Sequence, residues 1–301
     1  MKKLNEIHIR DPFILPDKKT GKYYMYGSTI SRSHKEPGFD CYASVDLIDW
    51  EEPVPIFRPD VSFWGKTDFW AAEAHEYNGD YYLFATFSNE GTVHMKDRMR
   101  GVGILRAHSP SGPFADHTGG PVTPSDCMCL DGSLYIDEEK NPWLVYCHEW
   151  VQLGNGAVCA VRLSHDLKSA VGEPHVIFHS LDASWSTLVE MPDMGYRGYV
   201  TDGCFVRRMK NGKLSLLWSC SCASGYCVGQ AISSGGKITG DWVMDKEPLF
   251  VTDGGHGMLF ESFDGDLLFP MHSPNKHPLE RPVIYRTEEN ENGFSITGRH
   301  G

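Results

Sequence analysis

The sequence has no uninterrupted apolar run long enough to cross a bilayer, which takes about 18–20 residues. It also has no cluster of lysine and arginine, and its 40 acidic and 28 basic residues give a net charge of -12. These absences argue against a membrane or a nucleic acid as partner. The first residues lack the apolar core of a signal peptide, so we expect a cytoplasmic protein, or a secreted one if a leader was removed.

The nine cysteines are an odd number, and no two of them have the C-x-x-C spacing of zinc and redox motifs. We therefore expect free buried thiols in a reducing compartment. Helical periodicity is almost absent as well. What the chain does contain is short runs of Tyr, Phe, Val, Leu and Trp that end at Gly, Asn and Asp turns, a pattern typical of antiparallel hairpins.

One hairpin pattern recurs five times, about every sixty residues. Each copy has a polar residue at or next to Gly or Pro, an apolar strand, a tight turn and a second apolar strand. The leading polar residues are Asp11, Glu73, Asp131, Asp202 and His256. Because further strands follow each hairpin, every repeat carries about four. The sequence therefore predicts an all-β fold, a single five-bladed β-propeller over residues 1–301.

The leading residues should form a ring, because the first strand of each propeller blade lies nearest the axis and side chains alternate along it. Glu73 lies six residues before its turn glycine, whereas Asp11 and Asp202 lie ten before theirs, so Glu73 sits at another depth. Carboxylates brought together lose hydration and repel one another, which raises the pKa of at least one. Such a pair of unlike carboxyls suits glycoside hydrolysis. The alternative, that each Asp only closes a turn, is less convincing for three matched positions.

The second strand of each hairpin returns to the mouth at which the first begins. In the third copy this end carries His148, Glu149 and Trp150, and in the fifth it precedes His272 and Arg281. We expect these side chains to overlook the same mouth, with Arg281 as a substrate clamp. Glu149 is weighed evenly between an acid and a blade-edge residue that pairs with a nearby arginine or amide.

Three long segments, 57–69, 88–101 and 179–199, separate the predicted strands and contain Trp, Tyr, His and Arg. Loops of this length in a compact domain are usually functional or disordered. Their composition is typical of a sugar-binding cleft, and loops around the mouth favour exo action on short oligosaccharides.

Taken in order, these motifs resemble glycoside hydrolase family 43, a group of five-bladed propeller enzymes. IRDPFIL resembles the first-blade motif, which implies that Asp11 is the general base, and LDGSLYID resembles the third, which implies that Asp131 adjusts the pKa of the acid and orients substrate. FWAAEAHEYNGDYYLF is similar to a Trp-Ala-Pro motif that begins at Trp70 here, with Ala72 in place of Pro. GGHGMLF resembles the fifth-blade motif, whose histidine, here His256, can help to hold calcium.

One departure from the family pattern concerns the general acid. The fourth-blade motif carries Glu in the family, whereas VTDGCF has the shorter Asp202. Three interpretations stay open: Asp202 is the acid in a rebuilt site, Glu149 or Glu73 has taken the role, or the protein binds sugar without cleaving it.

The resemblance implies an inverting glycosidase acting on oligosaccharides that contain arabinofuranosides or β-xylosides, as in plant cell walls. The alternatives are a catalytically silent carbohydrate-binding propeller and, less favoured, a protein-interaction propeller. No cofactor is expected to be required, although a structural calcium near His256 is considered. The expected substrate-binding residues are Trp70, Glu73, His148, His272 and Arg281.

Overall fold

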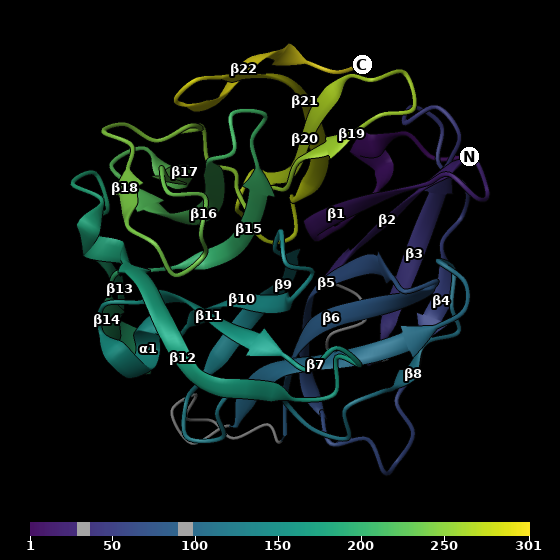
Figure 1. Cartoon of the computed structure of the whole chain (residues 1–301). Helices are drawn as coiled ribbons and strands as arrows, with labels where there is room; N and C mark the ends of the chain where they lie inside the picture. The colour runs from purple at the N-terminus through teal and green to yellow at the C-terminus, as the bar shows by residue number, and fades with distance from the viewer. Residues whose placement is uncertain (29–36, 90–98) are drawn as a thin grey trace.

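The computed structural model describes residues 1–28, 37–89 and 99–301. Five four-stranded antiparallel sheets surround a common axis like the blades of a propeller (Figure 1). The chain fills the blades in sequence order, so the colours of Figure 1 pass around the ring from purple to yellow. The predicted fold class and the content of four strands per repeat are confirmed.

The strands of each blade follow one another along the chain, the first lying next to the axis. Blade I contains β1 (Arg10–Asp17), β2 (Lys22–Ser28), β3 (Phe39–Ser44) and β4 (Val54–Phe57). Blade II contains β5 (Thr67–Tyr77), β6 (Asp80–Ser88), β7 (Arg100–Ala107) and β8 (Ala115–Asp116). Blade III contains β9 (Cys129–Ile136), β10 (Pro142–His148), β11 (Ala157–Leu163) and β12 (Ala170–His179). Blade IV contains β15 (Asp202–Arg208), β16 (Leu214–Cys222), β17 (Gly225–Ser233) and β18 (Trp242–Met244). Blade V contains β19 (Phe260–Glu261), β20 (Leu267–Ser273), β21 (Arg281–Asn290) and β22 (Gly293–Arg299).

Within residues 1–28, 37–89 and 99–301, helices are few and short. They are η1 (Leu4–Glu6), α1 (Trp150–Leu153), η3 (Ser180–Asp182) and η4 (Pro192–Met194). A two-stranded sheet, β13 (Val189–Met191) with β14 (Tyr196–Gly198), lies between blades III and IV in the sequence. Within the described residues, none of the helices has the length and apolarity that a membrane span requires.

The blades are joined by apolar side chains that interlock between neighbouring sheets. Phe39 and Phe57 of blade I pack against Phe69 and Phe87 of blade II, with ring centroids 5.2–6.5 Å apart across these four side chains. Burying a side chain of this size stabilises the fold by about 1.5–3 kcal/mol. All nine cysteines are free thiols, and all except Cys127 are buried, which confirms the prediction of buried thiols.

Candidate active site

Each inner strand contains, or in blade V follows, a residue with left-handed backbone geometry. We call these five positions the collar: Asp11 (φ 55), Ala71 (φ 47), Asp131 (φ 55), Gly203 (φ 54) and His256 (φ 54). In blades I to IV the pairing register of the first two strands shifts around the collar residue, which marks a β-bulge. A bulge redirects a side chain, so the same local irregularity repeated around the ring directs the collar side chains toward the axis.

The collar is stabilised by hydrogen bonds that link one blade to the next. A left-handed residue costs roughly 1–2 kcal/mol when it is not glycine, and an unpaired buried N–H costs about 1–3 kcal/mol more. At four boundaries the second strand of one blade supplies an acceptor for the collar N–H of the following blade. The donor–acceptor pairs are Ala71 N–H to Ser28 Oγ at 2.8 Å, Asp131 N–H to Thr86 Oγ1 at 2.9 Å, His256 N–H to Ser219 Oγ at 2.8 Å and Asp11 N–H to His272 Nδ1 at 3.3 Å.

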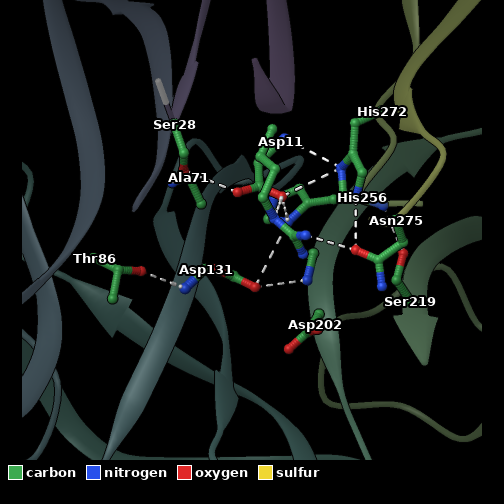
Figure 2. A network of polar contacts seen from close by, with 12 residues as sticks. Asp11, Ser28, Ala71, Thr86, Asp131, Asp202, Ser219, His256, His272 and Asn275 are labelled. Atoms are coloured by element: carbon green, nitrogen blue, oxygen red, sulfur yellow. Dashed lines mark hydrogen bonds and ion pairs between the residues drawn. The ribbon is translucent and has the colours of Figure 1, made fainter. Parts of the chain in front are cut away.

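Three collar side chains meet at the axis. His256 Nδ1 lies 3.1 Å from Asp11 Oδ1 and 3.7 Å from Asp131 Oδ2, and the three side chains point toward one another in Figure 2. Ser28 donates its hydroxyl hydrogen to Asp11 Oδ2 at 2.9 Å. Residues separated by more than two hundred positions in the sequence therefore share one buried polar cluster.

The charges of this cluster separate the protonation states of its members. Burial alone would raise the pKa of Asp11, but His256 and Arg10 outweigh it, and the net effect holds the pKa of Asp11 well below its usual range. Burial lowers the pKa of His256, but Asp11 and Asp131 raise it to about 10. At neutral pH, Asp11 is therefore a carboxylate and His256 an imidazolium.

The other two aspartates have the opposite tendency. Asp131 Oδ2 accepts the Gly203 N–H at 3.0 Å, yet burial and the nearby Asp202 keep the pKa of Asp131 above its usual value. Tyr226 donates its hydroxyl hydrogen to Asp202 Oδ2 at 3.0 Å, and burial raises the pKa of Asp202 as well. The site thus holds an ionised carboxylate beside carboxyls that retain protons, which is the combination that acid–base catalysis needs.

Glu149 belongs to a second network beside this cluster. Arg100, with a fully buried side chain, donates to Glu149, to Asp68 Oδ2 at 2.8 Å and to Ser88 Oγ at 3.3 Å. Its guanidinium also lies over the Trp70 ring, 4.5 Å from the ring centroid. Burial raises the pKa of Glu149 to about 7, although Arg100 opposes the shift.

Two expected residues lie close to the axis in other roles. Glu73 is two positions beyond the collar residue Ala71, is 5% exposed and has Oε2 3.3 Å from His75 Nε2. His272 is fully buried, and burial lowers its pKa to about 3. Its Nδ1 accepts the Asp11 N–H, and its Nε2 lies 3.2 Å from Asn275 Oδ1. A neutral imidazole therefore holds the backbone of Asp11 in place.

Two others do not join the cluster. His148 Nε2 lies 2.8 Å from Gln152 Oε1, because the chain turns into α1 immediately after β10 and directs this side chain toward the helix. Arg281 donates to the backbone carbonyls of Asn5, Pro278 and Glu280, so it fastens the loop before β21 to the N-terminal segment. A role for Arg281 as substrate clamp stays a prediction, and it would require these backbone contacts to be exchanged for contacts with the sugar.

Arg10 is the cationic residue that sequence reasoning missed. Its Nη1 donates to Asn275 Oδ1 at 2.6 Å and lies 3.3 Å from Glu280 Oε1, and its Nε lies 3.8 Å from Asp11 Oδ1. The side chain is 33% exposed, unlike the buried Arg100. Its position directly before the first collar residue was the available signal.

The long segments differ in what they do. Segment 57–69 is anchored through Phe63, which is 4% exposed among other Phe rings. Segment 179–199 forms η3, β13, η4 and β14. Most of the expected loop 88–101, namely 90–98, lies outside the described residues.

The donor set at His256 does not fit a calcium site. Calcium prefers six to eight oxygen ligands, and the described residues contain no group of three or more His, Cys, Asp or Glu side chains arranged to hold a metal ion. No step of the reaction is therefore derived through a metal.

The axial cluster of carboxyls in unlike protonation states has the groups that a glycosidase needs for acid–base catalysis. The family model of glycosyl hydrolases family 43 matches residues 5–300. The chain therefore belongs to glycoside hydrolase family 43, and it is a glycosidase that acts with inversion.

Solved structures support the assignment along the whole chain. The endo-arabinase from Bacteroides thetaiotaomicron VPI-5482 is 41% identical, with a TM-score of 0.89 over 97% of this chain and 98% of that one. An exo-1,5-alpha-L-arabinanase from a bovine ruminal metagenomic library shares the fold at 20% identity, with a TM-score of 0.68 and full coverage of both chains. Among curated proteins, extracellular endo-alpha-(1->5)-L-arabinanase 1 of Bacillus subtilis (strain 168) is 24% identical over 155 residues, which span 48% of this chain and 45% of that protein.

Proposed function

We propose that this enzyme hydrolyses α-L-arabinofuranosidic bonds in oligosaccharides derived from plant cell walls, with β-D-xylosides as the second substrate class. The observation that carries the proposal is the 41% identity, over nearly the whole of both chains, to a protein described as an endo-arabinase. The axial carboxyls supply the chemistry that either pentoside requires.

Asp11 acts as the general base. Its pKa lies below the usual range because His256 and Arg10 stabilise the charged form more than burial disfavours it. Ser28 and His256 hold the two carboxylate oxygens from different sides, at 2.9 and 3.1 Å. This carboxylate takes a proton from water as the water attacks the anomeric carbon, and inversion requires about 6.5–9.5 Å between base and acid to hold that water.

Asp202 acts as the general acid and gives its proton to the leaving oxygen. Burial raises its pKa, so it stays protonated at pH values at which Asp11 is ionised. Tyr226 fixes one of its oxygens, at 3.0 Å. Asp131, which is held by the Gly203 N–H, adds to the electrostatic environment that keeps the proton on Asp202 and orients the sugar.

Glu149 is assigned to the support of the site. It is 2% exposed, and one of its oxygens is bound by Arg100, so the carboxyl is committed to an internal partner. Trp70, over which the same guanidinium lies, offers an aromatic face of the kind that stacks on sugar rings.

Turnover of nitrophenyl glycosides tests this function. We expect hydrolysis of the α-L-arabinofuranoside, weaker hydrolysis of the β-D-xyloside and none of the β-D-galactoside. Proton NMR during hydrolysis of linear arabino-oligosaccharides should show the β-anomer of the new reducing end first, and the product sizes distinguish exo from endo action. Preference for the xyloside would contradict the substrate class, and absence of turnover on every pentoside would favour a silent carbohydrate-binding propeller.

A further inference from the structure

The collar hydrogen bonds are regular at four blade boundaries and differ at the fifth. The acceptors Ser28, Thr86, Ser219 and His272 share a register, since each lies opposite the residue that precedes the collar of its own blade. In blade III, which the structure describes completely, the residue at this position is Cys147, opposite Leu130.

The thiol changes how the next collar N–H is satisfied. Sulfur is a weak acceptor compared with a hydroxyl or an imidazole nitrogen. The Gly203 N–H, which by analogy with the other blades would point to position 147, instead donates to Asp131 Oδ2 at 3.0 Å. Asp131 is therefore held by the backbone of the following blade in a way that Asp11 is not.

Contacts with blade IV also restrict the position of Asp131. A Cβ at Gly203 would lie 2.7 Å from His256 Cγ, so the backbone approaches the histidine ring as closely as glycine allows. Cys204 Sγ donates to the Asp131 carbonyl oxygen at 3.2 Å. Asp131 thus receives one hydrogen bond at its backbone and one at its carboxylate from consecutive residues of blade IV.

We propose that Cys147 is a positioning residue: because it cannot compete for the Gly203 N–H, it leaves that donor to the carboxylate of Asp131 and thereby fixes the orientation of Asp131 beside His256. The proposal rests on the function proposed above, since it concerns the same carboxyl. In this proposal Cys147 acts indirectly. Because its thiol does not accept the Gly203 N–H, that donor remains available to Asp131.

A filler role for Cys147 predicts a different ranking of variants. The side chain is fully buried, so a residue that only fills space should lower Tm both in Cys147→Ser, which buries a hydroxyl, and in Cys147→Ala, which removes volume, and kcat should change alike in the two variants. The proposal predicts instead that kcat falls in Cys147→Ser alone. Serine at this position places a hydroxyl where Ser28, Thr86 and Ser219 already accept collar N–H groups, whereas alanine offers no acceptor.

The test is a comparison of Cys147→Ser and Cys147→Ala in the full-length protein. For Cys147→Ser we expect kcat on the α-L-arabinofuranoside to fall by about 10- to 100-fold, the order of loss that a misplaced catalytic group causes. The ionised form of Asp131 also loses a hydrogen bond, so its transition in the pH–rate profile moves to higher pH. Cys147→Ala should keep a kcat close to that of the parent while its Tm falls.

Cys159→Ser is the matched control, because Cys159 is also buried but belongs to β11 and lies outside the collar. It should lower Tm without moving the pH–rate profile. If Cys147→Ser keeps the parent's kcat and pH profile, or if Cys159→Ser moves the profile equally, the proposal is wrong.

A structural readout separates this inference from the proposed function. The amide proton of Gly203, hydrogen-bonded to the Asp131 carboxyl, should change its NMR shift as Asp131 titrates in the parent and in Cys147→Ala, and should lose this pH dependence in Cys147→Ser. If the parent cleaves no pentoside, the proposed function fails while this measurement still decides the hydrogen bond. An amide shift that titrates identically in all three proteins would overturn the inference.

Discussion

The axial cluster and the network around Arg100 both contain acidic side chains and cations, but the cations are distributed differently among the acids. In the Arg100 network, one fully buried guanidinium donates to both Asp68 and Glu149, so these two acidic side chains share its positive charge. On the axis, Asp11 receives the cations, because His256 and Arg10 both stabilise its charge, while burial keeps the pKa of Asp131 and of Asp202 high.

This difference teaches how a propeller obtains a base and an acid from like residues. Around Arg100, the cation only partly opposes the burial that raises the pKa of Glu149. On the axis, the cations beside Asp11 lower its pKa and so separate it from the raised pKa values of Asp131 and Asp202. Truncating one partner of either group tests the distinction, because the axial group should lose catalysis and the Arg100 network should lose stability first.

The largest expected effect is that of Asp11→Asn. Removal of the general base should lower kcat by about 10²- to 10⁴-fold, while KM changes little because the amide keeps the shape of the carboxyl. Steady-state kinetics on the aryl α-L-arabinofuranoside measure this. The control is Asp17→Asn, in the same strand, whose carboxylate bonds to Thr20 and Tyr81 away from the axis. This control should lower Tm and keep kcat; equal losses from both variants would mean that Asp11 has no special role.

The next effect compares Asp202→Asn with Glu149→Gln. Loss of the proton donor should be severe for oligosaccharides, whose leaving group needs protonation, and mild for a nitrophenyl glycoside, whose leaving group does not. Only Asp202→Asn should show this dependence on the leaving group. Glu149→Gln should mainly lower Tm, because it leaves the buried Arg100 with one fewer charged partner. The opposite pattern would identify Glu149 as the acid.

Arg10 and Arg281, which both link blade V to the N-terminal part of the chain, provide a smaller test. Arg10→Ala should lower kcat/KM by about tenfold, since it removes a cation close to Asp11 and a half-exposed donor at the mouth. Arg281→Ala should leave kcat/KM near the parent value, because its donors serve backbone carbonyls. A larger loss from Arg281→Ala would support Arg281 as the substrate clamp.

The pH dependence should show the smallest but most specific effect. The base must be ionised, so activity is lost only as pH falls through the pKa of Asp11, which lies well below the usual range of an aspartate. The acid must be protonated, so activity falls as pH rises through the raised pKa values of Asp202 and Asp131, which interact and titrate together. The kcat/KM profile should therefore be broad and bell-shaped, with its acidic limb below pH 4. An acidic limb near pH 6 would show that Asp11 is not stabilised as a carboxylate.

Much of the fold was predictable because turn residues and apolar runs are local signals. The turns at Gly79 and Gly212, for example, have the positive φ that glycine adopts without strain, and each lies within the hairpin that the sequence predicts. The fivefold repetition then required closure into a ring. The meeting of Asp11, Asp131 and His256 follows from that closure together with the left-handed geometry of the collar residues.

The register of the site was harder to predict, because β-bulges have no clear sequence signature. Counting from turn glycines aligned Asp202 with Asp11, whereas the left-handed residue of blade IV is Gly203, one position later. In blade II the collar residue is Ala71 rather than Glu73. Side-chain partners that are distant in the sequence could not be predicted either. No local pattern shows that Arg10 donates to Asn275, or that Arg281 donates to backbone carbonyls.

The role of Asp11 can be tested most directly by chemical rescue. Asp11→Gly should be nearly inactive on an aryl α-L-arabinofuranoside, and azide, which can enter the space left by the carboxylate and needs no base, should restore turnover. We expect the β-configured glycosyl azide as product, since the attack occurs from the face on which Asp11 activates water. Rescue that yields the α-azide, or no rescue in a folded variant, would contradict the assignment of Asp11 as the base of an inverting reaction.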